Sequence, residues 1–206
     1  MSIEVSALSR TAAETVHAAA PQLTLKLSAF PDLVLFAPKR FNDARGFFSE
    51  TFSLRNLASL GISENWVQDN FSLSLDKGVV RGLHLQRPPM AQAKLVRVNR
   101  GAIFDVALDM RPNSPTFGRH ACVELSANDW NQLYIPEGYA HGFCTLEADT
   151  EVVYKTSNYY SPEHEVGMLW DDPALGIPWP IDATMALLSP KDTRNARFAE
   201  IGPIDW

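Results

Sequence analysis

Residues 94–110 read KLVRVNRGAIFDVALDM, and apolar and polar side chains alternate on both sides of the triplet NRG. Alternation with a period of two is typical of β-strands, and a short break containing glycine between two such runs predicts a hairpin. The side chains of the second strand divide between two faces, because successive residues of a strand point in opposite directions. One face carries Ile103, Asp105, Ala107 and Asp109, and the other carries Phe104, Val106, Leu108 and Met110.

Further short runs of the same kind follow, namely HACVELS at 120–126, NQLYIP at 131–136 and EVVYKTSNYY at 151–160. The segments RPNSPTFG and PEGYAHG, which contain proline and glycine, separate several of them. Short strands with such frequent turns favour an antiparallel sandwich or barrel. One helix is expected near residues 53–61, SLRNLASLG, with Gly61 as its stop. The chain is therefore predicted to be mainly β.

The length of 206 residues suits one domain with room for an extra arm. Residues 1–23 are rich in Ala, Ser and Thr, and we expect them to form an N-terminal arm, either a short helix or a flexible segment. Residues 24–206 are expected to form the β domain. Its C-terminal part, residues 171–198, is rich in proline and is expected to wrap the barrel with short helical turns.

The composition restricts which partners and which compartment are expected. A net charge of −6 gives no electrostatic argument for binding DNA or RNA as a polymer, although a few arginines can still hold a small anionic ligand. No apolar run approaches the ~20 residues that span a bilayer, and the N-terminal segment lacks the pattern of a secretory signal. Cys122 and Cys144 make no disulfide framework, so reduced thiols and a cytoplasmic location are expected.

A histidine and a lysine lie close together in RGLHLQRPPMAQAKLVRV, residues 81–98, which predicts two strands joined by a Pro-Pro turn. Lys94 shares a strand face with Val96 and Val98, so its ammonium is expected to point toward the interior. A buried ammonium costs several kcal/mol unless a carboxylate or a ligand oxyanion compensates it. Removal of a proton next to a carbonyl creates such an oxyanion, and His84 is a suitable base. Alternatively, His84 is a satisfied core histidine and Lys94 reaches water at the rim.

A metal site is the weaker interpretation of the histidines. Jelly-roll metal sites usually place two histidines two residues apart, with a carboxylate close behind. Here the second position is Gln86, and no acidic residue appears between Gln86 and Asp105. A catalytic zinc or iron site generally needs three protein ligands, so this spacing disfavours one.

Two arginines suggest a phosphate-bearing ligand. Arg45 lies in FNDARGFFSETF and Arg81 in VVRGLH, each next to a glycine. Together they can hold a diphosphate, with Gln68 and Asn70 of VQDN as neutral hydrogen-bonding groups nearby. The alternative is that each is a solvated arginine in a turn.

Taken together, these motifs resemble the dTDP-4-dehydrorhamnose 3,5-epimerase family. The resemblance spans roughly residues 25–193 and is carried, in family order, by FNDARGFFSETF, VQDNFSLS, GVVRGLHLQRPPMAQAKLVRVNRGAIFDVALDMRPNSPTFG, LYIPEGYAHGF, VVYKTSNYYSPEHE, WDDPALGIPWP and LSPKD. It implies a cupin-like antiparallel jelly-roll barrel, usually a homodimer, with neither metal nor cofactor. It also implies a dTDP-4-keto-6-deoxyhexose substrate that is epimerised at C3, at C5 or at both.

The resemblance implies roles for individual residues. His84 would be the base, paired with Asp192 of the SPKD stretch, and Lys94 would stabilise the enolate. Tyr154 would be the acid on the opposite side of the sugar. The substrate-binding residues that it implies are Arg45, Arg81, Gln68 and Asn70 at the diphosphate, Phe41 and Glu50 at the thymine, and His141 near the sugar or phosphates.

Several alternatives stay open at this point. Epimerases that act only at C3 or only at C5 share these residues, and a non-catalytic cupin that binds a sugar nucleotide is a second class of function. A metal-dependent dioxygenase and a ketoisomerase are disfavoured by the histidine pattern. The sequence also leaves open whether Phe41 and Arg45 belong to the site of their own subunit or to that of a partner.

Overall fold

The computed structural model describes residues 23–202 and 204–206. The expected N-terminal arm at residues 1–23 therefore lies almost wholly outside the described residues. The division of the chain into that arm and a domain over residues 24–206 stays a prediction.

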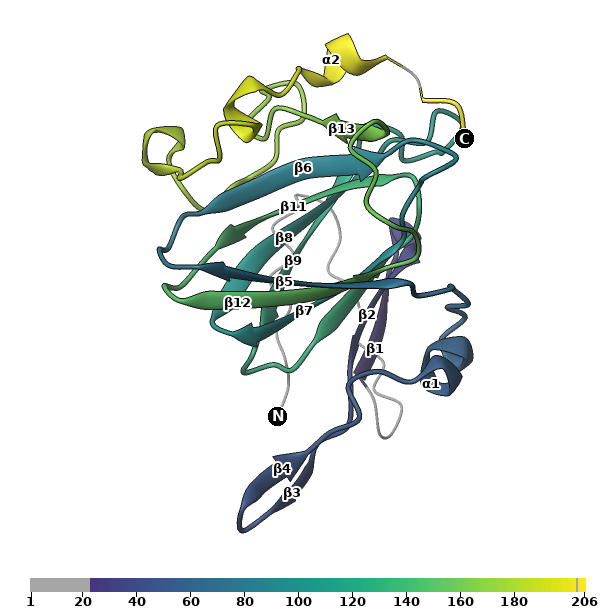
Figure 1. The fold of residues 1–206 in the computed structure, drawn as a ribbon, viewed down its shortest axis with the longest axis vertical. Coiled ribbons are helices and arrows are strands. Elements are labelled where there is room, and N and C mark those ends of the chain that lie inside the picture. Colours follow the sequence, from purple (N-terminus) through teal and green to yellow (C-terminus); the bar gives the residue numbers. More distant parts are fainter. Residues whose placement is uncertain (1–22, 203) are drawn as a thin grey trace.

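Two antiparallel sheets stand face to face and make up the barrel (Figure 1). Within the described residues, the six-stranded sheet has the order β1 (Leu23–Leu27), β2 (Phe30–Ala37), β10 (Gln132–Ile135), β7 (Lys94–Arg100), β12 (Thr150–Thr156) and β5 (Gln68–Ser74). The five-stranded sheet has the order β13 (Glu165–Gly167), β6 (Val80–Gln86), β11 (Tyr139–Thr145), β8 (Ala102–Asp109) and β9 (His120–Ser126). The predicted fold class, a mainly β antiparallel jelly roll, is confirmed.

The hairpin predicted at residues 94–110 is wrong, although both of its strands are present. β7 pairs with β10 and β12, whereas β8 pairs with β11 and β9 in the other sheet. The turn at Gly101 instead carries the chain from one sheet to the other, with φ of +78°, and a Cβ there would lie 2.4 Å from the Thr150 hydroxyl oxygen. Alternating polarity marks a strand but does not say which strand lies beside it. Successive strands from β5 to β8 alternate between the sheets in this way.

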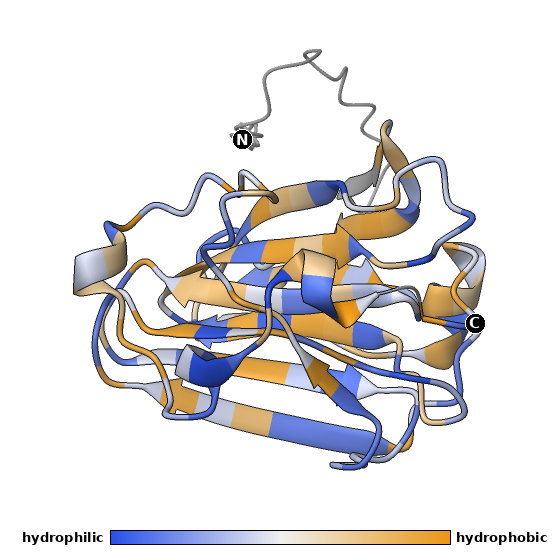
Figure 2. Ribbon diagram, turned by 90° about the horizontal axis from the view of Figure 1, so that it is seen from above, coloured by the Kyte–Doolittle hydropathy of each residue, from blue (hydrophilic) through white to orange (hydrophobic). Residues whose placement is uncertain are grey.

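The two faces of β8 are both buried, but against different partners. Ile103 and Ala107 point between the sheets and join the core formed with strands of the six-stranded sheet. Phe104, Val106 and Leu108 point outward and pack against the C-terminal segment. That segment contributes Met168, Trp170, Leu175, Trp179, Phe198 and Ile204 to this second core, and it crosses over the barrel in Figure 2.

Helices are short and lie outside the barrel. α1 (Leu54–Ser59) is capped by Ser53, and Gly61 follows it with φ of +83°, as expected from the sequence. The C-terminal segment contains η1 (Ala183–Met185), η2 (Asp192–Arg194) and α2 (Phe198–Ile201). No helix in the described part of the chain is long and apolar enough to cross a membrane.

A small hairpin of β3 (Phe41–Asp43) and β4 (Gly46–Phe48) projects away from the barrel (Figure 1). Its inner side is anchored, because the ring of Phe47 lies 4.9 Å from that of Trp130 and the Trp130 indole donates to the Ser49 hydroxyl at 2.9 Å. Its outer side is exposed at Phe41 and Phe48. We call residues 41–50 the arm; it is distinct from the N-terminal arm predicted at residues 1–23.

Candidate active site

A cavity of about 510 Å³ opens between the two sheets. Strands of both sheets contribute to its wall, together with residues 187–192, which we call the strap. The lining side chains are Ser72, Val79, Val80, Arg81, His84, Lys94, His141, Phe143, Tyr154, Leu187, Leu188, Ser189, Lys191 and Asp192. The chain therefore brings together all four residues with predicted catalytic roles.

His84 is held by a carboxylate from the strap. Its Nε2 lies 2.5 Å from Oδ1 of Asp192, which is buried and also accepts a hydrogen bond from the Ser189 hydroxyl at 2.9 Å. Burial alone would raise the pKa of Asp192, but the hydrogen bonds from His84 and Ser189 hold that pKa below its usual value. A carboxylate at Nε2 retains the proton on that nitrogen, so Nδ1 is the atom that is available to accept another.

Close packing of two strands places this imidazole opposite a second one. His84 on β6 lies in register with His141 on β11, and the register shifts just beyond this pair. Gly82 makes that approach possible: its φ is +103°, and a Cβ there would lie only 2.6 Å from the carbonyl oxygen of His141. Any larger residue would push β6 away from β11 and move His84.

Lys94 is buried beside the histidine. It is only 7% exposed, and its Nζ donates to the backbone oxygen of His84 at 3.2 Å. Burial lowers the pKa of Lys94 to about 8, against opposing effects of the charges on Asp105 and Glu165. The expectation that this side chain points inward is correct, and the alternative that it reaches water at the rim is not.

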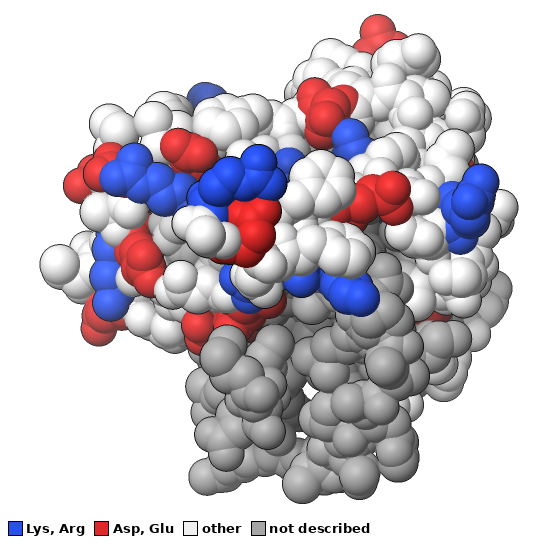
Figure 3. All heavy atoms as spheres, turned by 90° about the horizontal axis from the view of Figure 1, so that it is seen from below, with Lys and Arg blue, Asp and Glu red and all other residues white. Residues whose placement is uncertain are grey.

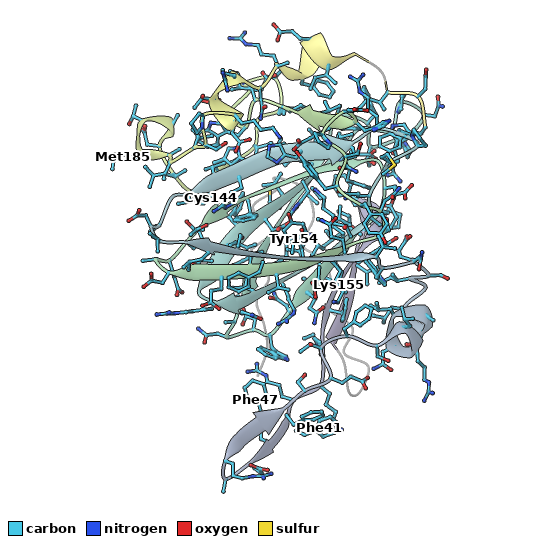
Figure 4. All side chains as sticks on the ribbon, viewed as in Figure 1. Phe41, Phe47, Cys144, Tyr154, Lys155 and Met185 are labelled. Atoms are coloured by element: carbon cyan, nitrogen blue, oxygen red, sulfur yellow. The ribbon has the colours of Figure 1, made fainter. Side chains whose placement is uncertain are left out.

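Tyr154 comes from the sheet opposite His84. It lies on β12, in register with Val96 and Asn70, near the middle of the barrel in Figure 4. Burial raises the pKa of Tyr154, which keeps the phenol protonated as a donor at neutral pH. The cavity thus has an imidazole on one wall and a phenol on the other.

Four of the predicted binding residues lie at or beside the cavity. Arg81 lines it and donates to Ser74 Oγ and Leu73 O, both at 3.3 Å. His141 lines it as well. Gln68 and Asn70 share a face of β5 with Ser72, a cavity residue, and are joined by a hydrogen bond of 2.8 Å.

The other three predicted binding residues, Phe41, Arg45 and Glu50, lie on the arm and do not line this cavity. The Arg45 side chain is 89% exposed and pairs with Asp43 of the arm at 2.6 Å. Glu50 accepts a hydrogen bond from Asn56 at 2.6 Å. One chain alone therefore does not bring them to the other site residues.

Sequence reasoning missed four polar residues around the site. Ser189 supports Asp192, and Lys191 of the strap pairs with Glu165 on β13. Glu165 follows a turn, whereas Ser189 precedes one and Lys191 lies in it, and none of the three carries a periodic signal. The fourth, Asp105, did have a signal: it is an acidic residue on a strand face that it shares with Ile103 and Ala107, and it accepts a hydrogen bond from His141 at 2.8 Å. Among the described residues, no group of three or more His, Cys, Asp and Glu side chains is arranged to hold a metal ion.

Comparison with known proteins identifies relatives of the whole β domain. The family model described as dTDP-4-dehydrorhamnose 3,5-epimerase matches residues 28–200. The dTDP-4-dehydrorhamnose 3,5-epimerase of Shigella flexneri is 50% identical over 171 residues, which cover 82% of this chain and 93% of the relative.

Solved structures agree with the sequence relatives. The dTDP-4-dehydrorhamnose 3,5-epimerase of Bacillus anthracis, with TDP and PPi bound, is 44% identical with a TM-score of 0.82, covering 85% of this chain and 99% of that one. The dTDP-6-deoxy-D-glucose-3,5-epimerase of Legionella pneumophila, in complex with dTDP-4-keto-L-rhamnose, is 42% identical with a TM-score of 0.82, covering 90% and 99%.

Proposed function

Because the chain belongs to the dTDP-4-dehydrorhamnose 3,5-epimerase family and is thus an isomerase, we propose that it epimerises a dTDP-4-keto-6-deoxyhexose at C3 and C5. One observation carries the proposal. A histidine bonded to a buried carboxylate and a tyrosine from the opposite sheet line the same cavity, with a buried lysine beside the histidine. This is the arrangement that proton removal on one face of a sugar and proton delivery on the other require.

His84 takes the proton in the proposed first step. The 4-keto group acidifies the hydrogens at C3 and C5, and Nδ1 of His84 removes one of them. The Asp192 carboxylate holds the required tautomer and stabilises the imidazolium that forms. No net oxidation or reduction occurs, so the chemistry itself needs no redox cofactor.

Lys94 stabilises the charge that this step creates. Loss of the proton leaves an enolate whose negative charge rests on O4, and one well-placed donor in a water-poor site contributes roughly 3 kcal/mol to such a transition state. A pKa of about 8 leaves Lys94 mostly protonated at neutral pH. The buried ammonium of Lys94 is thus paired with an oxyanion only while the enolate exists.

Tyr154 returns a proton from the other face and so inverts the centre. After the first inversion the sugar ring turns or shifts, and the second centre reacts in the same way. Arg81, which lines the cavity, would hold the diphosphate together with Gln68 and Asn70 on β5. The Bacillus anthracis relative binds TDP and PPi, which supports the same ligand class here.

Tyr154→Phe is expected to separate proton exchange from inversion. His84 can still remove a proton and return it to the same face, so deuterium should enter the sugar while inverted product forms about 10²-fold more slowly. Proton NMR of the reaction in deuterated water measures both quantities. Tyr159→Phe, which changes an exposed tyrosine outside the cavity, serves as the control. Inversion at the parental rate in Tyr154→Phe would remove Tyr154 as the acid.

The arm points to a homodimer in which each subunit completes the other's cavity. Phe41, Arg45 and Glu50 are exposed on the arm, and β5 leaves an exposed sheet edge that carries Phe71 and Leu73. We propose that the arm of a second copy supplies the base-binding phenylalanine and a second arginine for the diphosphate. On the face in Figure 3, basic and acidic side chains are interspersed, so no single-sign patch there opposes contact between copies.

Mixing two inactive variants tests this sharing. Arg45→Ala and His84→Ala should each be nearly inactive alone. In a mixed dimer, however, one site receives its histidine from one chain and its arginine from the other. We expect activity to reappear after the variants are unfolded and refolded together. Mixing His84→Ala with Asp192→Asn, which lie in the same cavity, is the control and should restore nothing. Absence of recovery in the first mixture would place the arm outside the site.

Product analysis tests the proposed function itself. The protein is incubated with dTDP-4-keto-6-deoxyglucose, and proton couplings of the product report the configuration at each carbon. Inversion at both C3 and C5 is expected. Inversion at a single centre would instead identify a C3-only or C5-only epimerase, and an unchanged sugar would contradict the proposal.

A further inference from the structure

Asp105 is a buried carboxylate with an incomplete set of partners. It lies on β8 and has no exposed surface. Its Oδ2 is 2.8 Å from Nε2 of His141, while its Oδ1 has no hydrogen-bond partner among the described residues. A buried carboxylate oxygen without a donor disfavours folding. Packing alone therefore does not account for an aspartate at this position.

The charge of Asp105 acts on a group that the proposed mechanism uses. No carboxylate of the described residues is hydrogen-bonded to Lys94, and its Nζ donates to a backbone oxygen. Of the charges that raise the pKa of Lys94, that of Asp105 is the largest and that of Glu165 is next. Glu165 is already paired with Lys191.

Among the other titratable groups around Lys94, each carboxylate already has a charged or catalytic partner. They are His84 and Arg81 on β6, His141 on β11, Tyr154 on β12, Glu165 on β13, and Lys191 and Asp192 near the strap's end. Asp192 is bonded to His84, and burial lowers the pKa of His141 and raises that of Tyr154, so both are neutral. Glu165 is thus paired with a lysine and Asp192 with the base, whereas Asp105 is paired with neither.

We propose that Asp105 is a positioning residue that keeps Lys94 in its ammonium form and fixes His141 as the neutral tautomer with its proton on Nε2. The inference rests on the proposed function only for its catalytic consequence. The carboxylate accepts the Nε2 proton of His141, which leaves Nδ1 of that ring as a hydrogen-bond acceptor. One buried negative charge thus partly offsets the burial of Lys94 without forming a tight ion pair, which would compete with the enolate for the ammonium.

The test substitution is Asp105→Asn, which keeps the size of the side chain and removes its charge. Lys94 should then lose its proton at lower pH, by about one pH unit or more. The alkaline limb of kcat/KM should move down by the same amount, and kcat/KM at pH 7.5 should fall about threefold or more, because less Lys94 is then protonated at that pH. A purely structural role would lower stability and leave the pH profile in place.

Asp109→Asn is the matched control. Asp109 lies on the same face of the same strand and is equally buried, but its oxygens are bound by Arg111, Ser114 and Thr116. This variant should be less stable than the parent and keep the parental pH profile. An alkaline limb that shifts equally in both variants, or in neither, would overturn the proposal.

Two NMR measurements on the protein without substrate make the outcome independent of the proposed epimerase activity. In lysine-labelled protein, with the Lys94 signal assigned from Lys94→Met, the titration midpoint should be lower in Asp105→Asn than in the parent. An equal midpoint would overturn the proposal even if epimerisation is confirmed. If Asp105→Asn does not fold, the parent still provides a test. Its His141 should be neutral with a proton on Nε2 at pH 7, and a proton on Nδ1 would contradict the proposal.

Discussion

His84→Ala is expected to lower kcat by about three orders of magnitude, while dTDP binding changes little. Removing a general base costs roughly 10²–10⁴ in rate, and His84 is the one imidazole in the described cavity that is bonded to the strap carboxylate. Because Arg81 and the arm are untouched, the variant should keep its affinity for dTDP. Steady-state kinetics and titration calorimetry measure the two quantities separately.

Two further variants sharpen the interpretation. Asp192→Asn should lose less activity than His84→Ala, because the imidazole remains but its tautomer and the imidazolium are no longer supported. His164→Ala is the matched control: this half-buried histidine bonds to Ser161 and does not line the cavity. It should retain parental kcat. Parental activity in His84→Ala, or an equal loss in His164→Ala, would contradict the assignment of the base.

Lys94→Met is expected to lower kcat/KM by about 10²–10³-fold and at the same time to stabilise the protein. The activity is lost because the enolate has no cation. The stability rises because burial disfavours the charged form of this lysine, lowering its pKa from 10.5 to about 8. That difference in pKa corresponds to a penalty on the order of 3 kcal/mol in the parent.

The gain in stability should depend on pH in a defined direction. Between pH 8 and 10.5 the unfolded chain binds a proton at Lys94 that the folded chain does not, so the parent becomes more stable as the pH rises. The advantage of Lys94→Met is therefore complete below pH 8 and lost above about pH 10.5. Urea unfolding at several pH values measures it. Lys77→Met, at an exposed lysine, should change neither activity nor stability.

A stable but inactive Lys94→Met would mark the lysine as a group kept for function at the expense of stability. If the variant were instead destabilised at pH 7, the ammonium would be balanced within the folded protein itself. If it kept parental kcat/KM, the enolate would have to be stabilised by another group.

Local patterns predicted much of this molecule. Alternation located the strands on either side of Gly101, and the lysine that shares a face with two valines proved to be buried beside His84. Alternation did not predict that β7 and β8 enter different sheets, because pairing depends on contacts distant in sequence. The partner of His84 is 108 residues away, and only the family resemblance connected it to the histidine.

The sequence did not predict where the arm lies or what Asp105 does, and the reasons differ. The arm carries charged and aromatic residues that suit either a ligand or a solvated hairpin, and the fold of one chain places it away from the cavity. Asp105 was noticed only as an acidic residue that comes too late in the chain to follow a metal-binding histidine. Its hydrogen bond to His141 and its effect on Lys94 depend on the packing of β8 against β11.

The central claim is that His84 removes a carbon-bound proton while Lys94 holds the resulting charge. Proton NMR of dTDP-4-keto-6-deoxyglucose with the protein in deuterated water tests it most directly. We expect the C3 and C5 proton signals to disappear as deuterium enters from the solvent, with His84→Ala and Lys94→Met showing almost no exchange. Deuterium incorporation by His84→Ala at the parental rate, or epimerised product from the parent without deuterium at either carbon, would contradict the mechanism.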